Sequence, residues 1–151
     1  MHFMPFFNSL YERGVNMRAL TFRLKPGADL FDSIETFVAD NQIEAGCILS
    51  AVGSLTHATL RLANRKYYNE YDGHFEIVSA TGTVSTNGSH LHLAFSDGDG
   101  VTIGGHLVTG CKIYTTAEIV LAALDDVVYK RELLMNDSGF EELMVYKKQK
   151  T

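Results

Sequence analysis

Cysteine and proline are both scarce in this chain. Of its 151 residues only two are cysteines and two are prolines. Cys47 and Cys111 do not form a C-x-x-C pair, so the sequence indicates no disulfide framework, and a cytoplasmic location is the default expectation. Without repeats, low-complexity tracts or a proline-rich linker, the chain is expected to form one domain.

Long apolar runs and an excess of basic residues are also missing. No window approaches the roughly 18 consecutive apolar residues of a membrane-spanning helix. The net charge is −5, from 13 basic and 18 acidic residues. Lys147, Lys148 and Lys150 form the one dense basic cluster. Because lysine and arginine neutralise nucleic-acid phosphates, this composition disfavours DNA as a partner. The sequence also lacks the G-x-S-x-G and Gly-rich phosphate-binding motifs.

Hydrophobic alternation dominates the pattern that is present. Residues 18–25 alternate with a period of two, which is typical of a strand. Asp29 is a plausible N-cap for a helix that extends to about residue 41. Further strands are predicted at 47–52, 57–63, 75–84, 89–96, 101–108, 113–121 and 140–146; 64–73 is predicted to be a turn or loop, and 127–135 fits either a strand or a short helix. One early helix followed by many strands predicts an α+β fold with a largely antiparallel sheet.

The segment before the first strand has no features of a signal peptide. Residues 1–16 lack a basic start, a long apolar core and a small-residue cleavage site. We therefore interpret them as an N-terminal extension, with the domain at 17–148 and a short tail at 149–151.

Three histidines are the strongest candidates for a functional site. In a strand at 89–96, His90 and His92 point to one face and the intervening leucines to the other. His106 joins them if this strand and the one at 101–108 form a hairpin of suitable register. A three-residue loop places His106 opposite His90, and a five-residue loop places it opposite His92, whereas a four-residue loop sends it to the other face. A bulge at Gly104-Gly105 is an alternative way to adjust the register.

Three neutral imidazoles with one open position are the ligand set of catalytic zinc. The open position suits a water, a substrate carbonyl or a carboxylate. The alternative is that these are ordinary surface or core histidines without a metal. Glu118 is the candidate acid/base, because a carboxylate among the apolar residues of 117–121 is unusual; an edge or solvent-facing position explains it equally well.

The same segments resemble a known family. The run Gly73–Val84, the motif His90-Leu91-His92-Leu93, the motif Gly104-Gly105-His106-Leu107 and Ala117-Glu118-Ile119 are similar to a stand-alone prokaryotic PPC domain, the plants-and-prokaryotes conserved domain. The resemblance covers roughly residues 18 to 147.

The resemblance implies an α+β fold and a homotrimer. Plant members carry the domain beside AT-hooks, and prokaryotic members are often labelled predicted DNA-binding proteins. This chain has no Arg-Gly-Arg-Pro hook, so that module does not carry over. The fold is also similar to that of acetolactate decarboxylase, a zinc enzyme whose H-x-H and G-G-H histidines match His90, His92 and His106. Its catalytic arginine and glutamates have no secure match here, so that reaction is not implied.

Two main functions follow from the sequence. The first is a metal-dependent enzyme or small-molecule binder, with Zn²⁺ or another divalent transition metal on the three histidines and a carbonyl or carboxylate ligand. The second is a DNA-associated regulatory protein in which the domain supplies trimerisation. A plain interaction module is a third alternative.

Overall fold

A computed structural model of the chain describes residues 16–134 and 139–148. Its elements are β1 (Met17–Leu24), α1 (Leu30–Asp40), β2 (Gly46–Arg61), β3 (Asn69–Val84), β4 (His90–Ser96), β5 (Thr102–Leu107), β6 (Lys112–Leu124), β7 (Val127–Leu133) and β8 (Glu141–Lys147). One helix and a mostly antiparallel sheet confirm the predicted α+β class. Nearly all of the predicted N-terminal extension and the whole tail lie outside the described residues.

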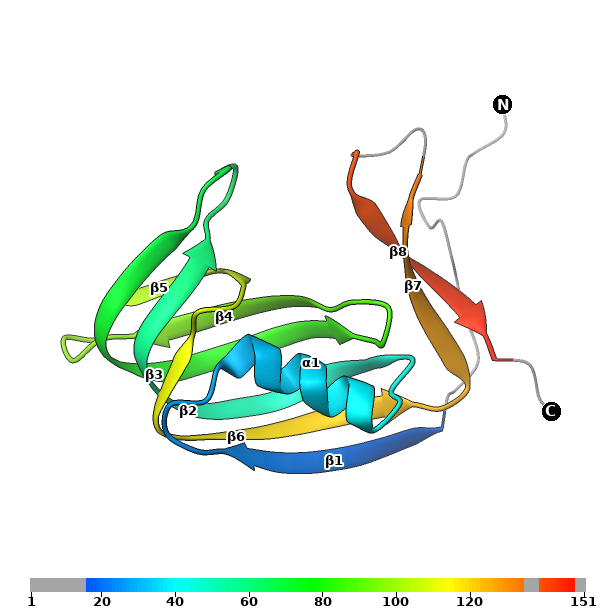
Figure 1. The fold of residues 1–151 in the computed structure, drawn as a ribbon, viewed down its shortest axis with the longest axis horizontal. Helices are drawn as coiled ribbons and strands as arrows, with labels where there is room; N and C mark the ends of the chain where they lie inside the picture. Colours follow the sequence, from blue (N-terminus) through cyan, green and yellow to red (C-terminus); the bar gives the residue numbers. More distant parts are fainter. Residues whose placement is uncertain (1–15, 135–138, 149–151) are drawn as a thin grey trace.

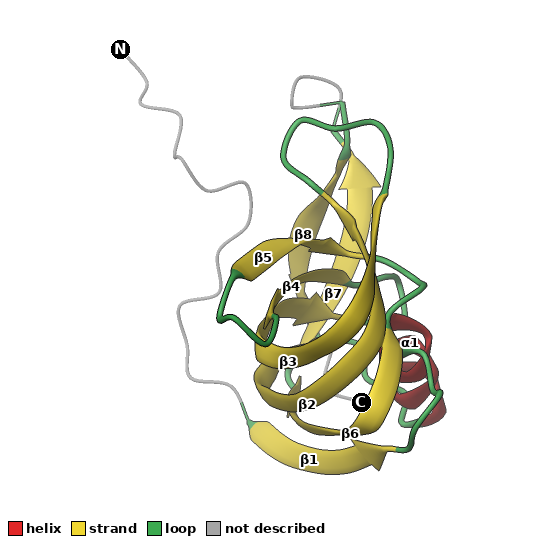
Figure 2. Cartoon of the chain, turned by 90° about the vertical axis from the view of Figure 1, so that its left-hand side faces the viewer, coloured by secondary structure: helices red, strands yellow, loops and turns green. Residues whose placement is uncertain are grey.

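Six strands form one sheet that curls back on itself. The strand order is β1-β6-β2-β3-β4-β5, and β7 and β8 form a separate two-stranded sheet. The curl arises because β5 also pairs with β2, where Leu60 and Arg61 lie opposite Leu107 and His106 (Figure 2). As a result, strands β2 to β5 enclose part of the core, and the β7–β8 hairpin projects beside them (Figure 1).

The helix covers the core face of the sheet and begins where the sequence predicts. Asp29 accepts a hydrogen bond from the backbone N–H of Asp32, which caps the first turn. Leu30, Ile34 and Val38 recur at helical spacing and are at most 1% exposed. They join the buried side chains of the strands in one hydrophobic core.

Two details of the strand prediction were wrong. The predicted strands at 47–52 and 57–63 are parts of one strand, β2, and β3 begins at Asn69, within the predicted loop at 64–73. Asp72-Gly73 is turn-like in sequence, but Asp72 pairs with His57 across the β2–β3 ladder. Pairing with a long neighbouring strand therefore overrides the local turn signal. The ambiguous segment at 127–135 contains a strand, because β7 pairs with β8.

No helix among the described residues is long and apolar enough to cross a membrane.

Candidate metal centre

The β4–β5 hairpin has the register that unites the three histidines. His92 lies opposite His106, and the ladder starts at Ser96 and Thr102, which leaves a five-residue loop. Asp97 stabilises this loop by accepting hydrogen bonds from the N–H groups of Asp99 and Val101 at 3.0 and 2.9 Å. The structure thus confirms one of the two registers predicted from the sequence, without a bulge at Gly104-Gly105.

The histidine nitrogens converge on a small volume. One ring nitrogen from each of His90, His92 and His106 lies within 4.8 Å of the other two. The Nε2 atoms of His90 and His92 are 3.3 Å apart. Their strand neighbours Leu91 and Leu93 point the other way and are 1% exposed, so core packing holds the imidazoles on the outer face.

This arrangement fits a metal ion. Two nitrogens bound at about 2.0–2.1 Å to a tetrahedral zinc lie about 3.3 Å from each other, which matches the separation of His90 and His92. The Nδ1 atom of His106 is buried and has no hydrogen-bond partner among the described residues. A buried polar atom without a partner is unfavourable, and a ligated cation would satisfy it.

The protein environment keeps two of the three imidazoles neutral. Burial, with the nearby charge of Arg61, lowers the pKa of His106 to about 4. Burial, followed by the proximity of His92, also lowers the pKa of His90. Since the neutral imidazole is the form that binds metals, His90 and His106 need lose no proton to bind one at neutral pH.

Glycines bring the neighbouring strands close to the histidines. Gly82 of β3 lies opposite Leu91 with a φ of +140°, and a Cβ there would lie 2.0 Å from the carbonyl oxygen of His90. A Cβ at Gly105 would lie 2.9 Å from the carbonyl oxygen of Arg61. Glycine at both positions therefore permits the backbone approach that holds His90 and His106 in place.

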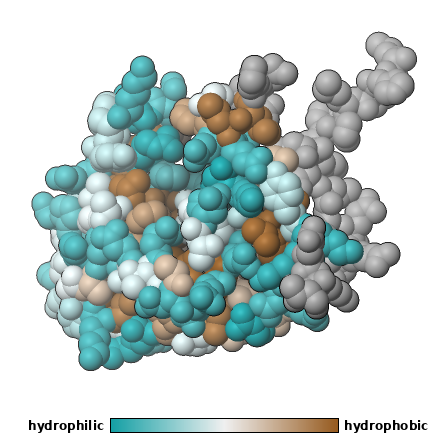
Figure 3. All heavy atoms as spheres, turned by 45° about the vertical axis from the view of Figure 1, so that its right-hand side comes forward, coloured by the Kyte–Doolittle hydropathy of each residue, from teal (hydrophilic) through white to brown (hydrophobic). Residues whose placement is uncertain are grey.

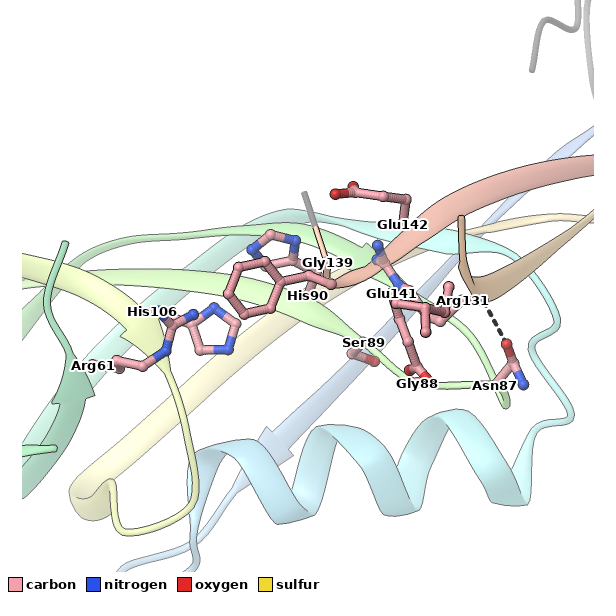
Figure 4. Close-up of a pocket in the computed structure, with 12 residues that line it drawn as sticks. Arg61, Asn87, Gly88, Ser89, His90, His106, Arg131, Gly139, Glu141 and Glu142 are labelled. Atoms are coloured by element: carbon pink, nitrogen blue, oxygen red, sulfur yellow. Dashed lines mark hydrogen bonds between the residues drawn. The ribbon is translucent and has the colours of Figure 1, made fainter. Parts of the chain in front are cut away.

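A pocket of about 740 Å³ opens beside two of the histidines (Figure 4). Its lining comes from five separate stretches of the chain: Arg61, Asn87, Gly88, Ser89, His90, His106, Arg131, Leu133, Gly139, Phe140, Glu141 and Glu142. A smaller hollow lined by Thr81, Gly82 and Thr83 reaches His90 and His92 from the other side. The cluster is thus accessible to a small ligand.

The charged side chains of this pocket were missed by the sequence analysis. Arg61, Arg131, Glu141 and Glu142 lie on β2, β7 and β8, far from the histidines in sequence. Charged residues at such positions are ordinary on strands, and no local pattern separates them from a solvent-exposed face. Only the β2–β5 pairing and the position of the β7–β8 hairpin bring them to the site.

Arg131 ties the β7–β8 hairpin to the rest of the site. Its backbone N–H donates to Oδ1 of Asn87 at 2.6 Å, and its Nη2 donates to Oγ1 of Thr83 at 2.6 Å. Burial lowers the pKa of the Arg131 guanidinium, an effect opposed by Glu142 and Glu141. These contacts hold the hairpin beside the turn between β3 and β4.

Glu118, the predicted acid/base, lies apart from the histidines. It is an exposed residue of β6, opposite Arg23 of β1 and Val52 of β2, and it does not line the pocket. The pocket's carboxylates are Glu141 and Glu142 instead. The assignment of Glu118 stays a prediction, and one chain alone does not bring this residue to the histidines.

Fold and site together define an α+β domain with a three-histidine cluster on a curled antiparallel sheet. Residues 11–125 match the Plants and Prokaryotes Conserved domain, abbreviated PCC or PPC. The chain belongs to this family, as the sequence motifs predict.

Several known proteins resemble the chain closely. The bifunctional protein GlmU of Synechococcus sp. (strain JA-3-3Ab) is 47% identical over 115 residues, which cover 76% of this chain but 18% of that protein. The chain therefore spans less than a fifth of the length of this relative. A hypothetical protein from Salmonella enterica is 36% identical with a TM-score of 0.88, covering 92% of this chain and 100% of that one. A metal-containing protein from Archaeoglobus fulgidus is 25% identical with a TM-score of 0.74, covering 90% of this chain and 99% of that one.

Proposed function

We propose that His90, His92 and His106 bind Zn²⁺ or another divalent transition metal, and that the site binds a small ligand through a carbonyl or carboxylate oxygen. The convergence of the three ring nitrogens within 4.8 Å carries this proposal. The unsatisfied Nδ1 of His106 supports it, as does the similarity to a protein described as metal-containing. Three histidines leave a tetrahedral ion one open position.

A bound zinc ion supplies Lewis acidity, by which it polarises a carbonyl or activates water. The chain's own residues that line the pocket would hold the ligand. Glu141 and Glu142 line the pocket and are placed to exchange a proton with a ligand there. A role for Glu118 in the same chemistry requires that a second subunit bring it to the pocket.

Metal content tests the proposal directly. We expect about one equivalent of zinc or another transition metal per chain in purified, untagged protein, and loss of that metal in His92→Ala. His74→Ala is the matched control, because His74 packs against Tyr114 with ring centroids 4.5 Å apart, outside the cluster. A wild-type protein that takes up no metal after reconstitution, or a His92→Ala variant that retains it, would overturn the proposal.

We also propose that the protein forms a homotrimer, as the family resemblance implies. Val52 and Val78 occupy adjacent strands, β2 and β3, and are 53% and 54% exposed. Packing of these two side chains against another subunit would remove apolar surface from water.

DNA association is the alternative function, and the charge of the chain disfavours it. A salt-titrated binding assay separates the two, because binding to DNA phosphates must weaken steeply with salt. Affinity for DNA that falls steeply between 50 and 200 mM salt, in a protein without metal, would favour the alternative.

A further inference from the structure

The two arginines of the pocket differ in whether their guanidinium groups already have partners within the chain. Arg131 donates to Thr83 and lies near Glu141 and Glu142. The side chain of Arg61 makes no hydrogen bond or ion pair with any described residue. The pocket therefore contains one guanidinium whose charge and donors are not engaged within the described part of the chain.

Arg61 is held next to the histidine cluster. It lies opposite His106 in the β2–β5 pairing, and directly opposed side chains on paired strands are within reach of one another. Figure 4 shows its guanidinium beside the His106 ring. The effect of Arg61 on the pKa of His106 is consistent with this proximity. An anion on Arg61 would thus lie beside a metal held by the three histidines.

The remaining lining favours a small organic anion. The hydroxyl oxygen of Ser89 is buried without a hydrogen-bond partner among the described residues, and Ser89 lines the same pocket. Leu133 and Phe140 add apolar surface to it. A single free guanidinium presents the planar fork that pairs with one carboxylate through two parallel hydrogen bonds. A phosphate would bring up to two negative charges, and the second arginine is already engaged.

We infer that this pocket binds a small carboxylic acid whose carboxylate pairs with Arg61 while a neighbouring carbonyl or hydroxyl oxygen faces the metal position. This inference rests on the proposed metal site, since it assigns the second anchor of the same ligand. Arg61 is then the residue that selects an acid over an uncharged carbonyl compound of the same size.

The test compares two arginine variants in the full-length protein. Pyruvate, a small 2-oxo acid, is titrated calorimetrically into zinc-loaded wild type, Arg61→Gln and Arg65→Gln, with its uncharged analogue pyruvamide and inorganic phosphate as further probes. Arg65 is a matched control, because it is four residues away, packs over Tyr67 and does not line the pocket. Zinc content is measured for each variant beforehand.

We expect zinc content to be equal in all three proteins and the Kd for pyruvate to rise at least about tenfold in Arg61→Gln alone, the loss expected for a charge-assisted pair. Pyruvamide should bind wild type and Arg61→Gln alike. Equal pyruvate affinity in wild type and Arg61→Gln would overturn the inference, as would an Arg61-dependent preference for phosphate or a failure to bind pyruvate.

The zinc content of the wild-type protein tests the metal site separately, because a wild type without zinc would show that the metal proposal fails. The same titration is then made on metal-free protein. Arg61-dependent binding of pyruvate there would support the carboxylate anchor by itself, and its absence would overturn both proposals.

Discussion

At the scale of single residues, burial lowers the pKa of His90 and His106 and so favours their neutral imidazoles. His106 is the clearest case, because its pKa is lowered to about 4 by burial first and then by Arg61. The unfolded chain, with a histidine pKa near 6.5, binds more protons than the folded protein between these values. Protonation of this residue therefore favours the unfolded state.

We accordingly predict that the metal-free protein loses stability as the pH falls from about 6.5 towards about 4, and that His106→Gln weakens this dependence. The measurement is urea unfolding of chelator-treated wild type and variant at pH 7.5 and 5.0. A variant with the same loss of stability as wild type between these pH values would show that another group is responsible.

Gly82 permits a close backbone approach that no other residue allows. Gly82→Ala places a methyl group 2.0 Å from the carbonyl oxygen of His90 at a φ of +140°. We expect the free energy of unfolding to fall by more than about 2 kcal/mol and metal affinity to fall with it, because His90 must move.

The control is Gly98→Ala, where a Cβ meets no atom within 4 Å and φ is not in the left-handed region. Its stability should change by less than about 1 kcal/mol. Urea unfolding and zinc titration of both variants check the pair; equal effects would contradict the role of Gly82.

At the scale of elements, the start of α1 is linked to the β-sheet through one carboxylate. Asp29 is 8% exposed and accepts from the N–H of Asp32 at 3.2 Å and of Gly110 at 2.7 Å, and it pairs with Lys112 at 3.3 Å. The helix cap and the segment before β6 therefore share one side chain.

Asp29→Ala should lower the free energy of unfolding by about 2–3 kcal/mol, since it removes the cap and leaves the N–H of Gly110 without this acceptor. Asp40→Ala is the control: this exposed aspartate at the other end of α1 faces the negative end of the helix dipole, so its removal should change stability by less than about 0.5 kcal/mol. Thermal or urea unfolding distinguishes the two, and a loss below about 1 kcal/mol in Asp29→Ala would contradict the shared role.

The β7–β8 hairpin is the element that completes the pocket. Leu133, the last residue of β7, and Phe140, just before β8, are 65% and 72% exposed, and apolar side chains are visible at the top of the molecule in Figure 3. Its connection to the rest of the site runs through Arg131. The pocket therefore depends on how a separate two-stranded sheet is attached to the main one.

At the scale of the whole molecule, the outer face of the sheet is the surface through which we expect the subunits to associate. We predict that Val52→Glu shifts the proposed trimer to smaller species, because it places an additional charge beside Val78 on the outer sheet face, where Glu118 already lies opposite Val52. Val101→Glu is the matched control, since Val101 is 57% exposed in the β4–β5 loop, away from this face. Light scattering coupled to gel filtration measures the mass of both variants; a trimeric Val52→Glu would place the interface elsewhere.

Much of the fold and the core of the site could be predicted from the chain alone. The helix from Asp29, the α+β class and the shared face of His90 and His92 follow from local periodicity, which depends only on neighbouring residues. The sequence predicted His106 as the third member only for certain loop lengths, because it did not decide the length of the β4–β5 loop or the register of the two strands.

The sequence by itself determined which residues can face the core and which can face outward. It therefore determined that His90 and His92 share one face of a strand, with His106 as the candidate third member of the cluster. The tertiary structure decided the β4–β5 register, the closure of β5 onto β2 and the position of the β7–β8 hairpin. Those features bring Arg61, Arg131, Glu141 and Glu142 to the histidines and leave Glu118 elsewhere. The reason is physical: strand pairing between distant segments depends on the packing of the entire core, which no local pattern encodes.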